Sequence, residues 1–214
     1  MINKLHICSP FLRITVSERK INQLIWDEFR KGSNEALEII YQDNYPSLYH
    51  YGMKFYKDAD LVKDLIQELF MELIDSGTKL SRTDNILFYL LRAFRNKVTR
   101  HLSEQSRFSS ISDGFKEFSL TESIETQLIK SETDQLSREQ VTDAIKKLSP
   151  KQQEIIYLRF YCDLSYEEIS TLFEVNVQTG RNLMSRAIST LKQELIQKRL
   201  RENLILFFYR LELH

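Results

Sequence analysis

Apolar residues recur every three to four positions along most of the chain from Ile21 onward, which is the period of amphipathic helices. Only 5 glycines and 3 prolines interrupt this pattern, and runs of alternating β-branched residues are nearly absent. The pattern therefore predicts an all-α protein. The helical period is missing from residues 1–20 and from residues 104–135. The second of these ranges is rich in serine, threonine and glutamate, which is the composition of a linker.

These interruptions predict two small helical domains, residues 21–103 and 136–198, joined by a flexible acidic linker over 104–135. Residues 1–20 are expected to form an N-terminal extension, and the apolar residues 199–214 a C-terminal extension. In the first domain, Gly32 is predicted to end a helix and Asn34 to cap the next one. Pro46 is predicted to lie in the first turn of a further helix.

The clearest helix pair lies between Leu164 and Leu195. Ser165 and Glu168 have the spacing of a capping box, and Asn176 suits the N-cap of a second helix after a short break. That second helix has an apolar stripe and, near its N-terminus, polar side chains that pair with base edges or phosphates: Gln178, Thr179, Arg181, Asn182, Ser185 and Arg186. The pattern predicts a helix-turn-helix that binds duplex DNA. An ordinary surface helix pair is the alternative interpretation.

Acidic residues follow one face of the helix predicted over residues 58–75. They fall every four positions, beside a parallel row of leucines: Asp60, Asp64, Glu68 and Glu72. Like charges at this spacing repel one another modestly, so the row is interpreted either as a solvated face or as a docking surface for a basic partner. The residues alone leave both interpretations open.

A basic helix follows a polar loop over residues 77–85, which contains Lys79 and Arg82. From Asn85 onward, aromatic residues are interleaved with cations: Arg92, Arg95, Lys97 and Arg100. Cations follow a nucleic-acid backbone and exposed rings stack on unpaired bases, so the composition suits single-stranded DNA. The alternative is a helix whose aromatic residues are in the core and whose cations are merely solvated.

The overall charge excludes a uniformly basic protein, because 30 basic residues balance 30 acidic ones. Cys8 and Cys162 are far apart and the histidines are isolated, so neither a disulfide framework nor a zinc site is expected. There is no catalytic motif or glycine-rich phosphate loop, so we expect no enzymatic activity and no cofactor. No apolar run is long enough to span a bilayer, and we expect a cytoplasmic protein.

Three segments resemble the extracytoplasmic-function class of bacterial RNA polymerase sigma factors. The first is VKDLIQELF at residues 62–70, and the second is YLLRAFRN at residues 89–96. The third combines LSPKQQEIIYLRFYCDLSYEEIS with the later NLMSRAISTL. The resemblance runs from about Ile21 to Lys198 and implies a promoter-melting domain, region two, joined by a linker to a helix-turn-helix domain, region four.

The resemblance also implies partners: core RNA polymerase, promoter DNA and an anti-sigma protein that restrains the chain. Polymerase docking would fall to the residues on and beside the acidic row: Asp60, Asp64, Gln67, Glu68 and Phe70. The downstream promoter element, with a flipped base, would be contacted by the loop and the basic helix: Lys79, Arg82, Asn85, Arg92, Arg95, Asn96, Lys97 and Arg100. The polar front of the second helix of the helix-turn-helix would read the upstream element.

Two residues depart from the family pattern in the helix-turn-helix. Gly180 stands where the family has a valine, which costs the helix up to about 1 kcal/mol relative to alanine and removes a packing side chain. Glu174 stands at a turn position that is often glycine. Outside the family, the alternative is a helix-turn-helix regulator of another class, such as a response-regulator output protein, which would need an upstream α/β phosphoacceptor domain.

Overall fold

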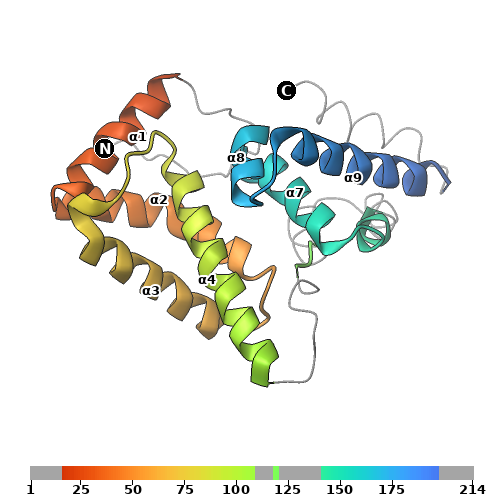
Figure 1. The fold of residues 1–214 in the computed structure, drawn as a ribbon, viewed down its shortest axis with the longest axis horizontal. Coiled ribbons are helices and arrows are strands. Elements are labelled where there is room, and N and C mark those ends of the chain that lie inside the picture. The colour runs from red at the N-terminus through yellow and green to blue at the C-terminus, as the bar shows by residue number, and fades with distance from the viewer. Residues whose placement is uncertain (1–15, 109–117, 121–140, 198–214) are drawn as a thin grey trace, which may run out of the picture. The chain divides into compact units, whose positions relative to one another are not determined.

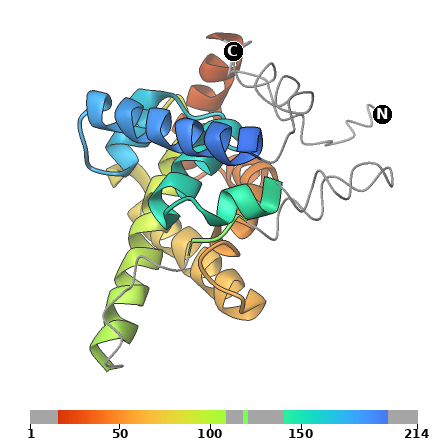
Figure 2. The ribbon, with the colours of Figure 1, turned by 90° about the vertical axis from the view of Figure 1, so that its right-hand side faces the viewer.

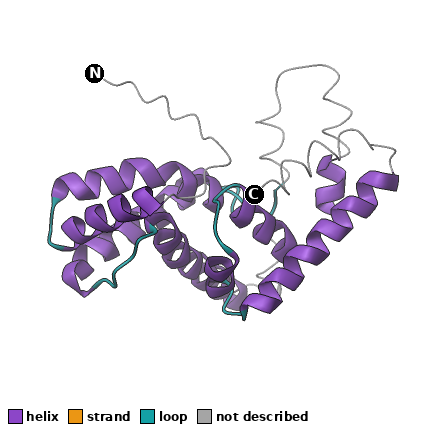
Figure 3. Ribbon diagram, turned by 90° about the horizontal axis from the view of Figure 1, so that it is seen from above, coloured by secondary structure: helices purple, strands orange, loops and turns teal. Residues whose placement is uncertain are grey.

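The computed structural model describes residues 16–108, 118–120 and 141–197 of the chain (Figure 1). The described residues form helices and connecting loops without a strand, so the all-α prediction is confirmed (Figure 3). Most of the expected N-terminal extension, most of the expected linker and the expected C-terminal extension lie outside these residues. The chain divides into two compact units, Met1–Gly114 and Phe115–His214, and each is described by itself.

The first unit is built from four helices and one short turn of 3-10 helix. In order they are α1 (Val16–Arg30), α2 (Asn34–Gly52), α3 (Ala59–Ser76), η1 (Gly77–Lys79) and α4 (Ile86–Phe108). Helix α1 therefore begins before Ile21, where the apolar period becomes visible, and α4 continues past residue 103. Helices α2, α3 and α4 pack against one another, and α1 packs on α2, η1 and α4.

Gly52, the last residue of α2, is buried where this helix meets α3 and α4. A Cβ atom at this position would lie 2.7 Å from Val62 Cγ1 and 3.1 Å from the Phe94 ring. Both distances are shorter than ordinary contacts between carbon atoms, so glycine permits this close approach. The core around it contains the fully buried side chains of Leu48, Tyr51, Ile66, Leu90, Leu91 and Phe94.

The helix boundaries of the first unit confirm one prediction and correct two. Gly32 has a φ of 96° and ends α1, as predicted, because this left-handed conformation favours glycine. Helix α2 is capped by Ser33 rather than Asn34, since Ser33 Oγ accepts a hydrogen bond from the Ala36 amide at 3.2 Å. Pro46 lies inside α2 and does not begin a helix, because buried residues on both sides of it keep one helix continuous.

The second unit contains a helical segment at residues 141–146, then α7 (Pro150–Phe160), α8 (Tyr166–Leu172) and α9 (Val177–Gln197). The predicted capping box of Ser165 and Glu168 is present at the start of α8. Asn176 Oδ1 accepts a hydrogen bond from the Thr179 amide at 2.7 Å, so the predicted cap of α9 is also present. Helix α9 packs along α7 and α8, as Figure 2 shows.

Candidate functional site

The polar front of α9 is fully on the surface of the second unit. All six predicted DNA-contacting residues are exposed: Gln178, Thr179, Arg181, Asn182, Ser185 and Arg186. The opposite side of the helix is buried against α7 and α8 through Met184, Ala187, Leu191 and Leu195. In the turn before α9, Glu174 has a φ of 56°, so a non-glycine residue takes the left-handed conformation there. The arrangement is a helix-turn-helix whose polar face is exposed within the described part of the second unit.

Arg181 has its charged group held by residues of α8. Its Nη2 atom lies 3.6 Å from Glu167 Oε1, and its Cζ atom lies 5.6 Å from the centre of the Tyr166 ring. Arg159 lies against the same ring at 5.4 Å. On the neighbouring turn, Gln178 Nε2 donates a hydrogen bond to Asn182 Oδ1 at 2.9 Å. In the unbound protein, these contacts join Arg181 to α8 and Gln178 to Asn182.

Gly180 lies on the other side of α9 from the polar front and is buried against α8. A Cβ atom built on Gly180 would overlap Ser170 Oγ, although it would lie 3.6 Å from Ser170 Cβ. Gly180 therefore lacks a packing side chain, as expected, but leaves no empty space beside α8. The two helices are so close at this point that the serine hydroxyl occupies the space of a side chain at residue 180.

The acidic row of α3 is exposed at Asp60, Asp64, Glu68 and Glu72, and Gln67 is exposed beside it. Two apolar side chains on the same helix are also exposed, Met71 by 54% and Ile74 by 46%. Sequence reasoning missed both, because they interrupt the polar face without a recognisable period. The carboxylates would complement a basic partner, and the two large apolar side chains offer it apolar contact area.

Phe70 does not share this exposed surface. Only 5% of it is exposed, and its ring lies 4.9 Å from the Tyr41 ring in an edge-to-face arrangement. Contact between Phe70 and polymerase stays a prediction, and the ring is buried in the unbound unit. It supports α3 from within the unit by packing on α2.

Lys97 crosses from α4 to the acidic row of α3. Its side chain is 4% exposed, and its Nζ atom donates hydrogen bonds to Glu68 Oε2 at 3.0 Å and Glu72 Oε1 at 2.8 Å. Burial by itself lowers the pKa of Lys97, but the hydrogen bonds and charges of Glu72 and Glu68 outweigh it, so the pKa is raised. Lys97 thus relieves the repulsion between the two glutamates, while Lys63 pairs with Asp60 at 2.9 Å.

The predicted downstream-promoter residues of α4 separate into exposed and buried sets. Arg92, Asn96 and Arg100 are exposed and, being four residues apart, share one stripe. Arg95 and Lys97 are buried, and so is Asn85, whose Oδ1 atom accepts a hydrogen bond from the Phe88 amide at 3.0 Å. DNA contact by these three residues stays a prediction, because their burial describes only the unbound unit. Their side chains lie within the unit rather than on the stripe.

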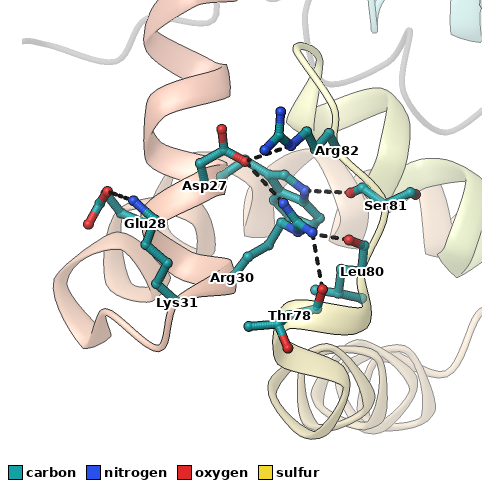
Figure 4. Close-up of polar contacts among 9 residues, drawn as sticks. Asp27, Glu28, Arg30, Lys31, Thr78, Leu80, Ser81 and Arg82 are labelled. Carbon is teal, nitrogen blue, oxygen red and sulfur yellow. Dashed lines mark hydrogen bonds and ion pairs between the residues drawn. The ribbon is translucent and has the colours of Figure 1, made fainter.

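The loop over residues 77–85 carries the two predicted cations, Lys79 and Arg82, at the surface. Its backbone is bonded to side chains of α1. Arg30 donates from Nε to the Leu80 carbonyl at 2.7 Å and from Nη2 to the Thr78 carbonyl at 3.1 Å (Figure 4). Trp26 Nε1 donates to the Ser81 carbonyl at 2.9 Å. The sequence contains no signal that links α1 with a loop some fifty residues later.

Neither a metal-holding cluster nor a membrane-spanning helix is found in the described part of the chain. Among residues 16–108, 118–120 and 141–197, no three His, Cys, Asp or Glu side chains are grouped so that they could hold a metal ion. No helix within the same ranges combines the length and apolarity required to cross a membrane. The candidate binding surfaces are the polar front of α9, the acidic row of α3, and the exposed cations of α4 and the loop.

Two family descriptions match the chain in order. Sigma-70 region 2 matches residues 40–108, which run from within α2 to the end of α4. Sigma-70, region 4 matches residues 138–191, which include α7, α8 and most of α9. Together the two matches cover more than half of the chain, and each falls within one compact unit.

Similar proteins point to the same family. RNA polymerase sigma factor SigV of Bacillus subtilis is 22% identical over 156 residues, which is 73% of this chain and 89% of SigV. RNA polymerase sigma factor YlaC of the same species is 22% identical over 79% of this chain and 98% of YlaC. The ECF RNA polymerase sigma factor BldN of Streptomyces coelicolor is 27% identical over 75% of this chain and 60% of BldN.

The fold also resembles a solved structure, the sigma factor RpoE of Bartonella quintana in complex with the anti-sigma factor NepR. The TM-score is 0.54 with 21% identity, over 74% of this chain and 95% of that one. Regions two and four are therefore both present, in the order and on the separate helical units that the family requires. The chain belongs to the sigma-70 family of RNA polymerase sigma factors, in its extracytoplasmic-function class.

Proposed function

We infer that this sigma factor binds core RNA polymerase and directs transcription initiation at a subset of promoters. The observation that carries the inference is the presence of both sigma regions, in order, with the polar front of α9 at the surface. A response-regulator output protein is not favoured, because the region-two match covers the helices where that protein would need an α/β phosphoacceptor domain. The polymerase performs the chemistry, and this chain supplies binding free energy.

Polymerase docking is assigned to α3, at Asp60, Asp64, Gln67 and Glu68. The carboxylates project from one helical face and would complement a basic partner surface, such as the clamp helices of the polymerase largest subunit. Exposed Met71 and Ile74 add apolar area on the same helix. Glu68 is shared with Lys97 and Asp60 is paired with Lys63, so Asp64 carries more of the uncompensated negative charge.

Downstream promoter contact is assigned to the surface cations that follow α3 in the sequence: Lys79, Arg82, Arg92 and Arg100, together with Asn96. An unpaired strand needs cations along its backbone and polar groups that reach its bases. The Arg92–Asn96–Arg100 stripe and the loop over residues 77–85 provide both. Base opening would then be stabilised because the melted strand binds here more tightly than duplex does.

Upstream promoter reading is assigned to the six polar residues on the front of α9. The second helix of a helix-turn-helix places its N-terminal side chains in the major groove. Arg181 and Arg186 would contact guanine edges or phosphates, whereas Gln178 and Asn182 suit adenine. An anti-sigma protein is proposed as the restraining partner, in keeping with the RpoE structure, which contains NepR.

Run-off transcription tests the proposed function directly. Purified chain and core polymerase are incubated with a library of genomic promoter fragments, and the transcripts are sequenced. A defined subset of start sites, sharing two sequence elements and absent without the chain, is the expected result. Transcripts that are the same with and without the chain would contradict the function.

A further inference from the structure

The loop over residues 77–85 has little regular structure of its own. Its internal hydrogen bonds include the one from the Leu80 amide to the Gly77 carbonyl at 3.2 Å within η1. At its far end, Thr83 Oγ1 bonds to both the amide and the carbonyl of Asn85. A loop that becomes ordered only when it binds DNA loses conformational entropy, and this loss lowers its affinity. The loss is smaller when another part of the protein already holds the loop in place.

Helix α1 holds the middle of this loop through its backbone. Three loop carbonyls, those of Thr78, Leu80 and Ser81, accept hydrogen bonds from Arg30 and Trp26. Trp26 is fully buried, with its ring 4.7 Å from Tyr89 of α4, so its indole nitrogen is a fixed donor. The Arg30 side chain is 19% exposed and is held in turn by Asp27 at 3.2 Å.

The same helix also contacts loop side chains at two further positions. Asp27 Oδ1 lies 3.9 Å from Arg82 Nε, so one carboxylate lies between the largely buried Arg30 and the exposed side chain of Arg82 (Figure 4). Farther toward the N-terminus of α1, Arg19 Nη1 lies 3.0 Å from Asp84 Oδ2. Contacts with α1 therefore extend along the loop from Thr78 to Asp84.

We propose that α1 is a splint for promoter recognition: Arg30, supported by Trp26 and Asp27, holds the loop in the conformation that presents Lys79 and Arg82 to the melted promoter strand. The proposal rests on the proposed downstream contact and adds positioning residues to it. The splint bonds end on backbone carbonyls, so they determine the path of the loop and leave its exposed side chains to determine which bases are preferred. Arg30 then contributes to selectivity without contacting DNA.

The test uses holoenzyme assembled from core polymerase and full-length chain. The probe is a library of pre-melted promoter fragments with a randomised stretch in the non-template strand, selected for binding and then sequenced. For Arg30→Met we expect a weaker base preference and about tenfold weaker binding to the fragment that the wild type selects most strongly. The reason is the loss of a guanidinium that orders several loop atoms. The dependence of log affinity on log salt should keep the wild-type slope, since no phosphate contact is removed.

Three further variants sharpen the comparison. Lys31→Met removes one positive charge from the neighbouring position. The Lys31 ammonium bonds to Glu28 of α1 at 2.7 Å and not to the loop, so we expect the base preference and affinity of the wild type. Arg82→Ala removes a proposed direct contact and should make the salt slope shallower by about 0.7 for a single strand. Arg30→Lys keeps the charge but has a compact ammonium in place of the guanidinium fork. Its base preference and its affinity should therefore lie between those of the wild type and Arg30→Met.

The outcomes distinguish failure of the splint from failure of the proposed downstream promoter contact. If the wild type selects no bases, the downstream contact fails and the splint falls with it. If the wild type selects bases and Arg30→Met selects the same ones equally tightly, the splint alone is overturned. Equal loss of polymerase pull-down and of upstream-duplex binding in both Arg30→Met and Arg30→Lys would show a merely structural residue and would also overturn it.

Discussion

Gly180 of α9 faces Ser170 of α8 at a separation that leaves no room for a Cβ atom beside the serine hydroxyl. Ser170 Oγ is buried and, within the described residues, has no hydrogen-bond partner. At this point, α9 therefore approaches α8 as closely as the serine hydroxyl allows. This proximity also makes the effect of a substitution at either residue depend on the other.

This dependence predicts opposite effects for the same substitution in two backgrounds. Gly180→Ala alone should destabilise the second unit by about 1 kcal/mol, because the overlap with Ser170 Oγ exceeds the gain in helix propensity. In a Ser170→Ala background the new Cβ would lie 3.6 Å from the Cβ atom of residue 170, and the same change should stabilise by up to about 1 kcal/mol. Hydrogen exchange of the α9 amides in the full chain measures both. Additive effects would contradict the close approach.

Replacement of Lys97 tests the link between α3 and α4. Lys97→Met removes two charge-assisted hydrogen bonds and should lower the free energy of unfolding by about 1–2 kcal/mol. The effect is no larger because both glutamates are well exposed, and solvent weakens their interaction with Lys97. Urea unfolding of the full chain provides the measurement. The matched control is Lys63→Met, whose exposed pair with Asp60 should contribute nothing measurable. Equal effects of the two substitutions would mean that burial of Lys97 is unimportant.

The contribution of Lys97 should also depend on pH. Because its pKa is raised in the folded protein, its stabilisation is fully present below the ordinary lysine value of 10.5 and is lost as pH rises through the folded value. The difference in unfolding free energy between wild type and Lys97→Met should therefore stay constant from about pH 7 to about pH 10 and shrink above pH 10.5. A difference that stays constant above pH 10.5 as well would show that the methylene chain, rather than the charge, provides the stabilisation.

Charge reversal on α3 separates polymerase docking from folding. Glu68 is bonded to Lys97, so reversing its charge would disturb the packing of α3 on α4 as well as the surface. Asp64 is exposed and lies on the same row, which makes Asp64→Lys the cleaner test. We expect this variant to lose most core-polymerase pull-down while upstream-duplex binding is unchanged. Wild-type pull-down would remove α3 from the docking surface.

On α9, removal of a cation should be visible in the salt dependence of duplex binding. Arg181→Ala and Arg186→Ala should each weaken binding to the upstream element, and the slope should become shallower by about 0.9 for each phosphate that is no longer neutralised. Glu167→Gln should have the opposite effect of tightening binding slightly, because Glu167 lies 3.6 Å from Arg181 and competes with DNA for it. Unchanged slopes in both arginine variants would mean that this face does not meet DNA.

Local sequence was sufficient for the elements themselves. Ser165, Glu168 and Asn176 bond to backbone groups within three residues, so the start of each helix in the helix-turn-helix follows from adjacent residues alone. Period and composition likewise determined the all-α class, the acidic row of α3 and the polar front of α9. The prediction from Pro46 was wrong because its ring is tolerated once flanking residues are buried by other helices.

Only the tertiary structure decided which polar residues remain on the surface. Asn85, Arg95 and Lys97 lie on or beside a helix rich in cations, and no periodicity says which side of that helix another helix will cover. The splint from Arg30 to Leu80 joins residues far apart in the sequence, and its donors bond to carbonyls that every residue type possesses. At Gly180, local sequence predicts only the lower helix propensity of glycine. Its role depends on Ser170, a neighbour brought close by the packing of α8 on α9.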